Sequence, residues 1–436
     1  MRRALPFYLL VCLPLAAQQA PIPAATELPG SPFFIKKTWF IGGAGNWDYA
    51  TMDSAARRLY IAHGRSVQVV NVDTGSLAGE IPGFRDAHAI ALDDTGEFGY
   101  VSDGPAGLVK VFDRHTLAVE ATIPIFCSPR SIAFEPQSEL AFAVCGTNAA
   151  VPAAPPPPIR RSAAGGANAS RPNVRPEPTN ISGTSHVVAI DTRTKSVLVD
   201  MIMPGDFRFA QPDRDGHVYI SVGAAQFTLV SNGRTIHEFV PQRIASLNAP
   251  AIAAEARRQP GQPSQPTSPP GHAVLMDWTG YAIPGTLGRF LPLSSACANP
   301  QGLAVDSKDQ RLFVACEDQQ FEVLNASTGG IVASLTTGPG DDAIGYDREP
   351  GLIFVANGAG YGSLTIIRQD AITDSYSVIQ NLPTRERART LAADSATGEV
   401  YLVTDFQGVD LTKPGGIGTL HADPIPGSFQ VLVVGH

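Results

Sequence analysis

Charged residues are scarce in this sequence, because Lys, Arg, Asp and Glu make up only 17% of its 436 residues. The net charge is −8, so the chain gains little from counterion release, which disfavours general nucleic-acid binding. Five cysteines occur without a C-x-x-C pair, which excludes the usual zinc and haem spacings. The G-x-S-x-G, H-E-x-x-H and G-x-x-x-x-G-K motifs are also absent, and we predict neither a metal site nor a cofactor.

Long apolar runs are confined to the N-terminus. The first 20 residues, MRRALPFYLLVCLPLAAQQA, place two arginines before a short apolar run and small residues, which is typical of a Sec-type signal peptide. No later segment reaches the roughly 18 uninterrupted apolar residues of a membrane-spanning helix, so we expect no membrane anchor in the mature form. We therefore predict a signal peptide at 1–20, a linker at 21–32 and a periplasmic or secreted location.

Glycine and proline, by contrast, are plentiful at 42 and 37 residues, which favours short strands joined by turns. The stretch DAHAIALDDTGEFGYVSDG (86–104) has a pattern that returns along the chain: a strand, an acidic residue, a turn and an aromatic-led strand. The aromatic landmarks, at steps of 40, 42, 77, 94, 41 and 47 residues, are Tyr60, Tyr100, Phe142, Tyr219, Phe313, Phe354 and Tyr401. The acidic landmarks, seven positions earlier, are Asp53, Asp93, Glu135, Asp306, Asp347 and Asp394, with Pro212 followed by Asp213 in the fourth unit.

Repeats of about 40 residues have the spacing of four-stranded propeller blades. We predict an all-β, seven-bladed β-propeller that spans 33–436 as one domain and is a monomer. The strand at 33–43 has no partner before it, and the strand at 427–435 has none after it. We expect these two strands to pair in one blade and close the ring, because closure removes exposed strand edges.

The landmark strands read YIAHG (60–64), YVSDG (100–104), YISVG (219–223) and FVANG (354–358). In these strands the chain resembles the extracytoplasmic YVTN/YncE-type β-propeller family, over roughly residues 33–435 without the insertions. The resemblance implies the propeller fold and a location outside the cytoplasm. Members of this family serve varied roles, so the resemblance does not select an activity.

Five positions before each acidic landmark, counting Asp213 in the fourth unit, the sequence is polar in all seven units. These residues are Asp48, His88, Arg130, Arg208, Gln301, Asp342 and Arg389. Three positions before the landmark, all seven residues are apolar. Because the first strand of each blade lines the central channel, we predict that the polar residues form a ring at its mouth that binds a ligand. Polar residues that merely solvate a wet mouth would show the same pattern.

Arginine exceeds acid in this ring, and TRERAR (384–389) adds two more arginines beside it. Forked hydrogen bonds from arginine suit an anion, so the predicted ligand is a small anionic molecule or a protein partner at the top face. An Arg–Asp network tying the blades together is the alternative. Trp47 and Tyr49 flank the ring, where they either stack on the ligand or simply pack. His88 would make binding pH-sensitive.

Two further hypotheses stay open. One is an enzyme that resembles the lactonase-type propellers, which act at the channel mouth. That resemblance implies that His88 or Asp342 activates water as a general base while an arginine stabilises the developing oxyanion. A non-catalytic scaffold that recruits a partner through its proline-rich insertions is the other hypothesis.

The wide steps in units three and four indicate insertions at about 147–184 and 232–272, between the second and third strands. The first is rich in Pro, Gly and Ala, which predicts an extended or disordered segment. The second begins at Asn232-Gly233, a hairpin turn signal, and AIAAEARRQ (251–259) is a candidate short helix. We assign VVAID (187–191) and AVLMD (273–277) as the third strands that follow. The insertions are either a lid or docking arm, or a tolerated surface expansion.

The four cysteines beyond the signal peptide form two pairs in sequence. Cys127 and Cys297 precede the first strands of units three and five, and Cys145 and Cys316 lie three residues past the aromatic landmark on the adjacent strand. Because adjacent antiparallel strands bring these positions to the same rim, we predict Cys127–Cys145 and Cys297–Cys316 disulfides. Buried free thiols are the alternative.

Overall fold

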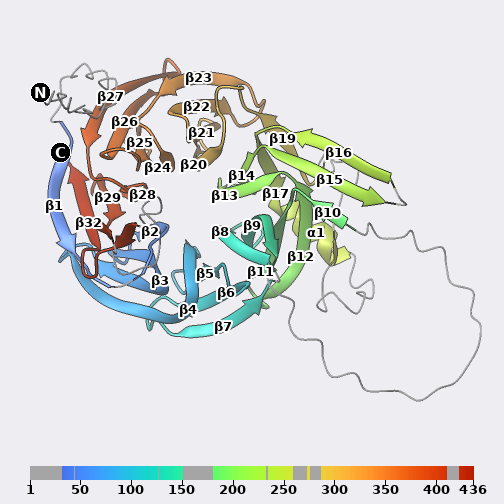
Figure 1. Cartoon of the computed structure of the whole chain (residues 1–436), viewed down its shortest axis with the longest axis horizontal. Coiled ribbons are helices and arrows are strands. Elements are labelled where there is room, and N and C mark those ends of the chain that lie inside the picture. The colour runs from blue at the N-terminus through green and yellow to red at the C-terminus, as the bar shows by residue number, and fades with distance from the viewer. Residues whose placement is uncertain are drawn as a thin grey trace, which may run out of the picture.

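A computed structural model describes residues 32–43, 45–125, 127–150, 180–231, 234–258, 273–274, 286–409 and 422–436. Its strands form sheets arranged in a ring around a common centre (Figure 1). The predicted signal peptide, nearly all of the linker and residues 151–179 of the first insertion lie outside the described residues. Within the described ranges, no helix is long and apolar enough to cross a membrane.

The first two sequence units share one sheet of order β2-β3-β4-β5-β6-β7. Its strands are β2 (Ala50–Asp53), β3 (Arg58–Asn71), β4 (Ser76–Leu92), β5 (Phe98–Asp103), β6 (Leu108–Asp113) and β7 (Val119–Pro124). Counted over the described residues as sheets of four or more strands, the ring has six members, where the sequence predicts seven blades. The reason is β4, whose 17 residues run unbroken from the outer strand of the first unit into the inner strand of the second.

Units three and four form sheets of order β18-β12-β11-β9-β8 and β13-β14-β17-β19. The strands are β8 (Cys127–Glu135), β9 (Leu140–Ala150), β11 (Thr184–Asp191), β12 (Ser196–Pro204), β13 (Asp206–Pro212), β14 (His217–Gly223), β17 (Arg243–Asn248), β18 (Ala273–Val274) and β19 (Gly288–Pro292). The prediction that AVLMD is the third strand of unit four is wrong. The segment 243–248 already occupies that place beside β14, and β18 pairs parallel with β12 instead.

Units five and six are regular four-stranded antiparallel sheets. They contain β20 (Pro300–Asp306), β21 (Arg311–Cys316), β22 (Gln320–Asn325), β23 (Ile331–Thr336), β24 (Asp341–Asp347), β25 (Leu352–Asn357), β26 (Ser363–Asp370) and β27 (Ser375–Pro383). The last sheet joins both ends of the chain in the order β1-β32-β29-β28. It contains β1 (Phe34–Phe40), β28 (Thr390–Asp394), β29 (Glu399–Thr404) and β32 (Gln430–Gly435). β1 runs antiparallel to β32, with Phe34 opposite Gly435.

One strand from each predicted insertion, β10 and β16, joins a small sheet beside the ring, of order β10-β15-β16, in which β15 directly precedes the second insertion (Figure 1). They are β10 (Asn180–Ser182), β15 (Ala225–Ser231) and β16 (Arg234–Val240). The predicted hairpin is confirmed, with Ser231 opposite Arg234, although the two turn residues lie outside the described part of the chain. A second small pair is β30 (Gln407–Val409) with β31 (Ala422–Pro424).

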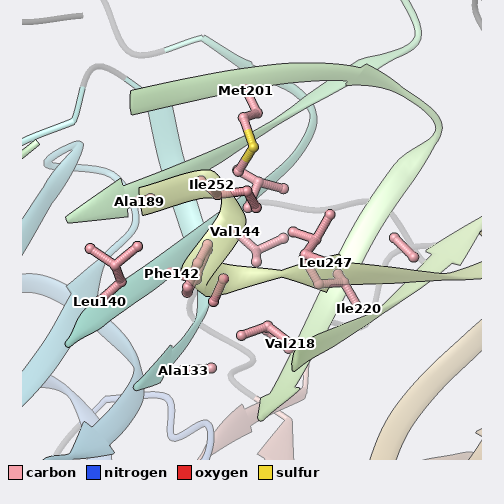
Figure 2. Close-up of a cluster of buried hydrophobic side chains, with 14 of the residues drawn as sticks. Ala133, Leu140, Phe142, Val144, Ala189, Met201, Val218, Ile220, Leu247 and Ile252 are labelled. Atoms are coloured by element: carbon pink, nitrogen blue, oxygen red, sulfur yellow. The ribbon is translucent and has the colours of Figure 1, made fainter. Parts of the chain in front are cut away.

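The predicted helix is also confirmed, as α1 (Ala249–Arg258). The side chain of Asn248 accepts a hydrogen bond from the Ala251 backbone N–H at 3.0 Å and so caps its first turn. The buried face of α1 packs into the core between units three and four, where Ile252 lies among side chains of β9, β12 and β17 (Figure 2). This part of the second insertion is therefore integral to the fold and is not a surface expansion.

The seven aromatic landmarks are all buried, none more than 3% exposed, so each repeat contributes the same second-strand side chain to the core. The acidic landmarks organise the turns that follow the inner strands. Asp93, for example, accepts hydrogen bonds from the backbone N–H groups of Gly96 and Phe98, each at 3.1 Å. Asp93 thus fixes the turn that joins the first strand of unit two to its second.

Candidate ligand-binding site at the channel mouth

One cavity of about 700 Å³ lies where the inner strands begin; we call it the mouth cavity. All seven residues of the predicted ring line it: Asp48, His88, Arg130, Arg208, Gln301, Asp342 and Arg389. They come from all seven sequence units, on or directly before β2, β4, β8, β13, β20, β24 and β28. The structure thus brings together side chains that are up to 341 positions apart in the sequence.

Irregular backbone at the start of the inner strands positions five of these side chains. The pairing register shifts at the positions that bracket His88, Arg130, Arg208, Gln301 and Asp342. Such bulges re-aim side chains and free backbone groups from the ladder. Side-chain hydroxyls on the adjacent strand take up the freed groups: Ser102 Oγ accepts from the Ala89 N–H at 3.0 Å, and Ser221 Oγ accepts from the Phe209 N–H at 3.1 Å.

Glycines that end the landmark strands leave room for the ring. A Cβ at Gly104 would lie 2.6 Å from His88 Cδ2, and one at Gly223 would lie 3.0 Å from Arg208 Nη2. Because real Cβ atoms do not approach other atoms so closely, a larger residue would displace the ring side chain. The final glycines of YVSDG and YISVG therefore leave space for the side chains of His88 and Arg208.

The arginines differ in how well they are neutralised. Arg130 is exposed in the cavity and forms no ion pair with any residue that the structure describes. Arg208 Nε lies 2.9 Å from Asp206 Oδ2, whereas Arg389 Nε lies 3.5 Å from Asp342 Oδ2. Arg389 also lies over the Trp47 ring at 5.4 Å, so Trp47 packs against an arginine rather than lining the cavity. The Arg–Asp network predicted as the alternative is thus present only in part.

His88 and Asp48 form a close pair that links the first two units. His88 Nδ1 lies 2.6 Å from Asp48 Oδ2, and its Nε2 lies 4.0 Å from Asp86 Oδ2. Burial acts to lower the pKa of His88, but the hydrogen bond to Asp48 and both carboxylate charges outweigh it, so the pKa lies above the ordinary value. A carboxylate that orients an imidazole in this way can support either ligand binding or general-base chemistry.

Acidic groups that the sequence did not assign to the ring also line the cavity. Glu317 follows β21, and Asp341 directly precedes Asp342 at the start of β24. Burial raises the pKa of Asp342 to about 6; Arg389 opposes the shift, whereas Asp48 and Glu317 add to it. Both added residues come from the ends of strands outside the repeated position, so the repeat carried no signal for them.

Tyr49 forms the floor of the mouth cavity. Its ring packs against Phe209 at 5.0 Å across the centre of the ring. Tyr49 also lines a second cavity of about 300 Å³, bounded mainly by apolar residues of the inner strands. Burial, together with the charges of Asp342 and Asp48, holds the pKa of Tyr49 well above its ordinary value. Tyr49 is thus shared by the mouth cavity and by the second cavity along the inner strands.

Both predicted disulfides are confirmed and lie beside the site. Cys127–Cys145 joins β8 to β9 close to Arg130, and Cys297–Cys316 joins the approach to β20 with the end of β21, next to Glu317. Each therefore anchors a segment that carries a cavity residue. Among the described residues, no group of three His, Cys, Asp or Glu side chains is arranged to hold a metal ion.

The sheets and their ring arrangement define the chain as a β-propeller. Among solved structures it is similar to the RRP9 WD40 repeats, with 8% identity and a TM-score of 0.57 over 94% of this chain and 100% of that one. It is also similar to U3-55K, at 8% identity, TM-score 0.55, and 90% and 97% coverage. A chain of the Mitotic Checkpoint Complex matches at 12% identity, TM-score 0.55, and 89% and 95% coverage.

At these identities the likeness shows the fold alone. No family model and no curated protein matches the chain, so the YVTN/YncE resemblance stays a prediction.

Proposed function

We propose that this chain is an extracytoplasmic, seven-bladed β-propeller that binds a small anionic molecule in the mouth cavity. The seven-blade interpretation assigns the two halves of β4 to separate blades and takes the β1–β32 pair as the closure of the ring. It is supported by seven buried landmarks and by one ring residue from each unit. The two disulfides favour an oxidising compartment.

The observation that carries the ligand assignment is the convergence of seven equivalent positions on one cavity, with Arg130 exposed there and unpaired among the described residues. Arginine side chains bind carboxylates and phosphates through charge-assisted, often bidentate, hydrogen bonds. Arg389 is held only at 3.5 Å from its carboxylate and can turn toward a ligand. An anion at this position would accept hydrogen bonds from the guanidinium groups of both Arg130 and Arg389.

Isothermal titration with phosphate and with glutarate tests the proposal. We expect Arg130→Ala to weaken binding about tenfold or more, the loss of one charge-assisted hydrogen bond. Arg368→Ala is the matched control, because Arg368 is exposed on β26 away from the cavity. Equal binding by both variants would remove the site. Turnover of a lactone panel that His88→Ala abolishes would instead assign the hydrolase.

A protein partner at the top face is the second candidate. Tyr361, in the loop that follows cavity residues Gly358 and Ala359, is 89% exposed. Phe406 and Ile425 are also exposed and share a 2.7 Å backbone hydrogen bond. Exposed apolar side chains of this kind can form part of a protein interface. A partner retained by the tagged chain but lost from Tyr361→Ser with Phe406→Ser would support this candidate; Ile372→Ser, 98% exposed elsewhere, is the control.

A further inference from the structure

We propose that the molecule bound in the mouth cavity also carries a cationic amine, held by an acidic arc of Glu317, Asp341 and Asp342. The ligand class is thus a small zwitterion rather than a simple anion. The inference rests on the proposed anion binding in the same cavity and extends it to the opposite charge.

The charges in the mouth cavity are separated along the ring. Arg130 and Arg208 come from the adjacent units three and four, whereas Glu317 comes from unit five and the two aspartates from unit six. Arg387 and Arg389 of unit seven also line the cavity, so guanidinium groups flank the acidic arc on both sides. A ligand with a single negative charge would satisfy guanidinium groups but not the arc.

The surroundings of Asp341 are the strongest evidence for a cation-binding group in the mouth cavity. Asp341 lines the cavity but is only 1% exposed, and its Oδ1 has no hydrogen-bond partner among the described residues. Its Oδ2 accepts a hydrogen bond from the Thr337 hydroxyl. The charges that act on it, from Asp318 and Asp342, are both negative. A buried carboxylate oxygen without a donor, on a group without a counter-ion, is costly, and an ammonium group would supply both.

Asp342, the next residue, is also incompletely neutralised. Its nearest cation is Arg389 Nε at 3.5 Å, beyond an ordinary charge-assisted hydrogen bond. Among the described residues, the hydrogen-bond partner of the Glu317 side chain is the amide of Gln301, at 3.5 Å. Burial raises the pKa of Asp341 to about 8 and that of Asp342 to about 6, the latter against the opposing charge of Arg389.

An amine fits this arc chemically. A primary ammonium has three donors and can bond Asp341 and Asp342 together, while the other end of the molecule reaches the arginines. The mouth cavity, at about 700 Å³, is large enough for a short linear zwitterion with its first water shell. Binding would also ionise Asp341, so near neutral pH it should release a proton.

Three linear five-carbon probes separate the two ends of the site: glutarate, 5-aminopentanoate and cadaverine. They carry two carboxylates, one carboxylate with one amine, and two amines. Titrating the full chain to about 10 mM would detect even a Kd of about 1 mM. We expect 5-aminopentanoate to bind about tenfold or more tightly than glutarate, because it gains a charge-assisted contact.

Two isosteric variants test the acidic arc. Asp341→Asn and Asp342→Asn should remove the preference for 5-aminopentanoate and leave glutarate binding within about twofold. Asp347→Asn is the matched control: Asp347 lies at the other end of β24, is also buried with an unpartnered Oδ1 in the described chain, and does not line the cavity. It should keep the preference, which separates a site effect from a folding effect.

The outcomes are distinct. Glutarate that binds as tightly as 5-aminopentanoate overturns the amine and leaves the anion site standing. Cadaverine alone, with binding lost in Asp341→Asn, supports the acidic arc and overturns the anion site. A fourth titration uses calcium chloride. Calcium binding that Asp341→Asn abolishes, without binding of any amine probe, would overturn the proposal that the ligand is a zwitterion. Binding of none of the three probes counts against both proposals.

Discussion

Arg114 ties the first two sequence units together on the side of the ring away from the mouth cavity. It follows β6 and is buried, with Nη2 bonded to Asp53 and Nη1 at 3.3 Å from Asp93 Oδ1. Nη1 also donates to the Asp93 backbone carbonyl at 2.9 Å. Both carboxylates are acidic landmarks of the repeat. Replacing Arg114 with methionine keeps much of the apolar stem but removes the cation that both carboxylates share.

The loss of stability in Arg114→Met depends on the hydrogen bonds that Asp53 and Asp93 retain. Asp93 keeps three donors, from Thr95, Gly96 and Phe98, but Asp53 keeps only the Ala56 N–H at 3.0 Å. Breaking a buried ion pair by removing one partner typically costs about 3–5 kcal/mol. Because Asp93 stays well bonded, we expect a loss near the lower end, about 3 kcal/mol.

Urea unfolding followed by tryptophan fluorescence measures this loss. Arg258→Met is the control, because Arg258 forms an exposed pair with Glu255 on α1 and should change stability by about 0.5 kcal/mol or less. Adding Asp53→Asn to Arg114→Met should recover part of the loss, since it removes the uncompensated charge. If Arg114→Met lowered the free energy of unfolding no more than Arg258→Met, Arg114 would not be a stabilising counter-ion for Asp53 and Asp93.

Three further predictions follow from the same structure. Reducing both disulfides should cost about 3 kcal/mol each in urea unfolding, since each closes a short loop, and reactive thiols in the unreduced folded protein would contradict it. Asp48→Asn should lower the pKa of His88 in an NMR titration. In the wild type, the His88–Asp48 pair contributes its full stabilisation below the ordinary histidine pKa. That stabilisation is lost as the pH rises through the raised pKa of His88. The pKa of Asp341, raised to about 8, should make stability fall as pH rises from about 4 to that value, and Asp341→Asn should flatten the fall. An unchanged His88 titration, or an unchanged pH slope in Asp341→Asn, would contradict these assignments.

The ring of the mouth cavity could be predicted because every unit has its polar residue at the same distance in sequence from the acidic landmark. The acidic landmark sets a turn, and side chains alternate along the inner strand before it, so a fixed offset returns equivalent positions. His88 and Ile90 show the switch from polar to apolar within one strand. The disulfides could be placed for the same reason, since a known strand pairing brings Cys127 to Cys145.

Features outside the repeat could not be predicted. AVLMD ends in an acid, as do VVNVD (69–73), VKVFD (109–113) and VVAID of units one to three, whereas the true strand, β17, ends in Asn248, so pattern alone selected the wrong segment. The continuity of β4 could not be predicted either, because Pro82-Gly83 ordinarily marks a turn between two strands, and the pairing with β3 shifts register beside it. Glu317 and Asp341 enter the cavity from strand ends whose direction is set by tertiary packing, and a local pattern carries no information on that direction.

The most direct test of the account is a crystal structure of the protein grown with 5-aminopentanoate. We expect the carboxylate within hydrogen-bond distance of Arg130 or Arg208, and the amine against Asp341 and Asp342, inside one cavity lined by all seven ring residues. A ligand bound elsewhere, or ring residues dispersed over separate surfaces, would contradict it.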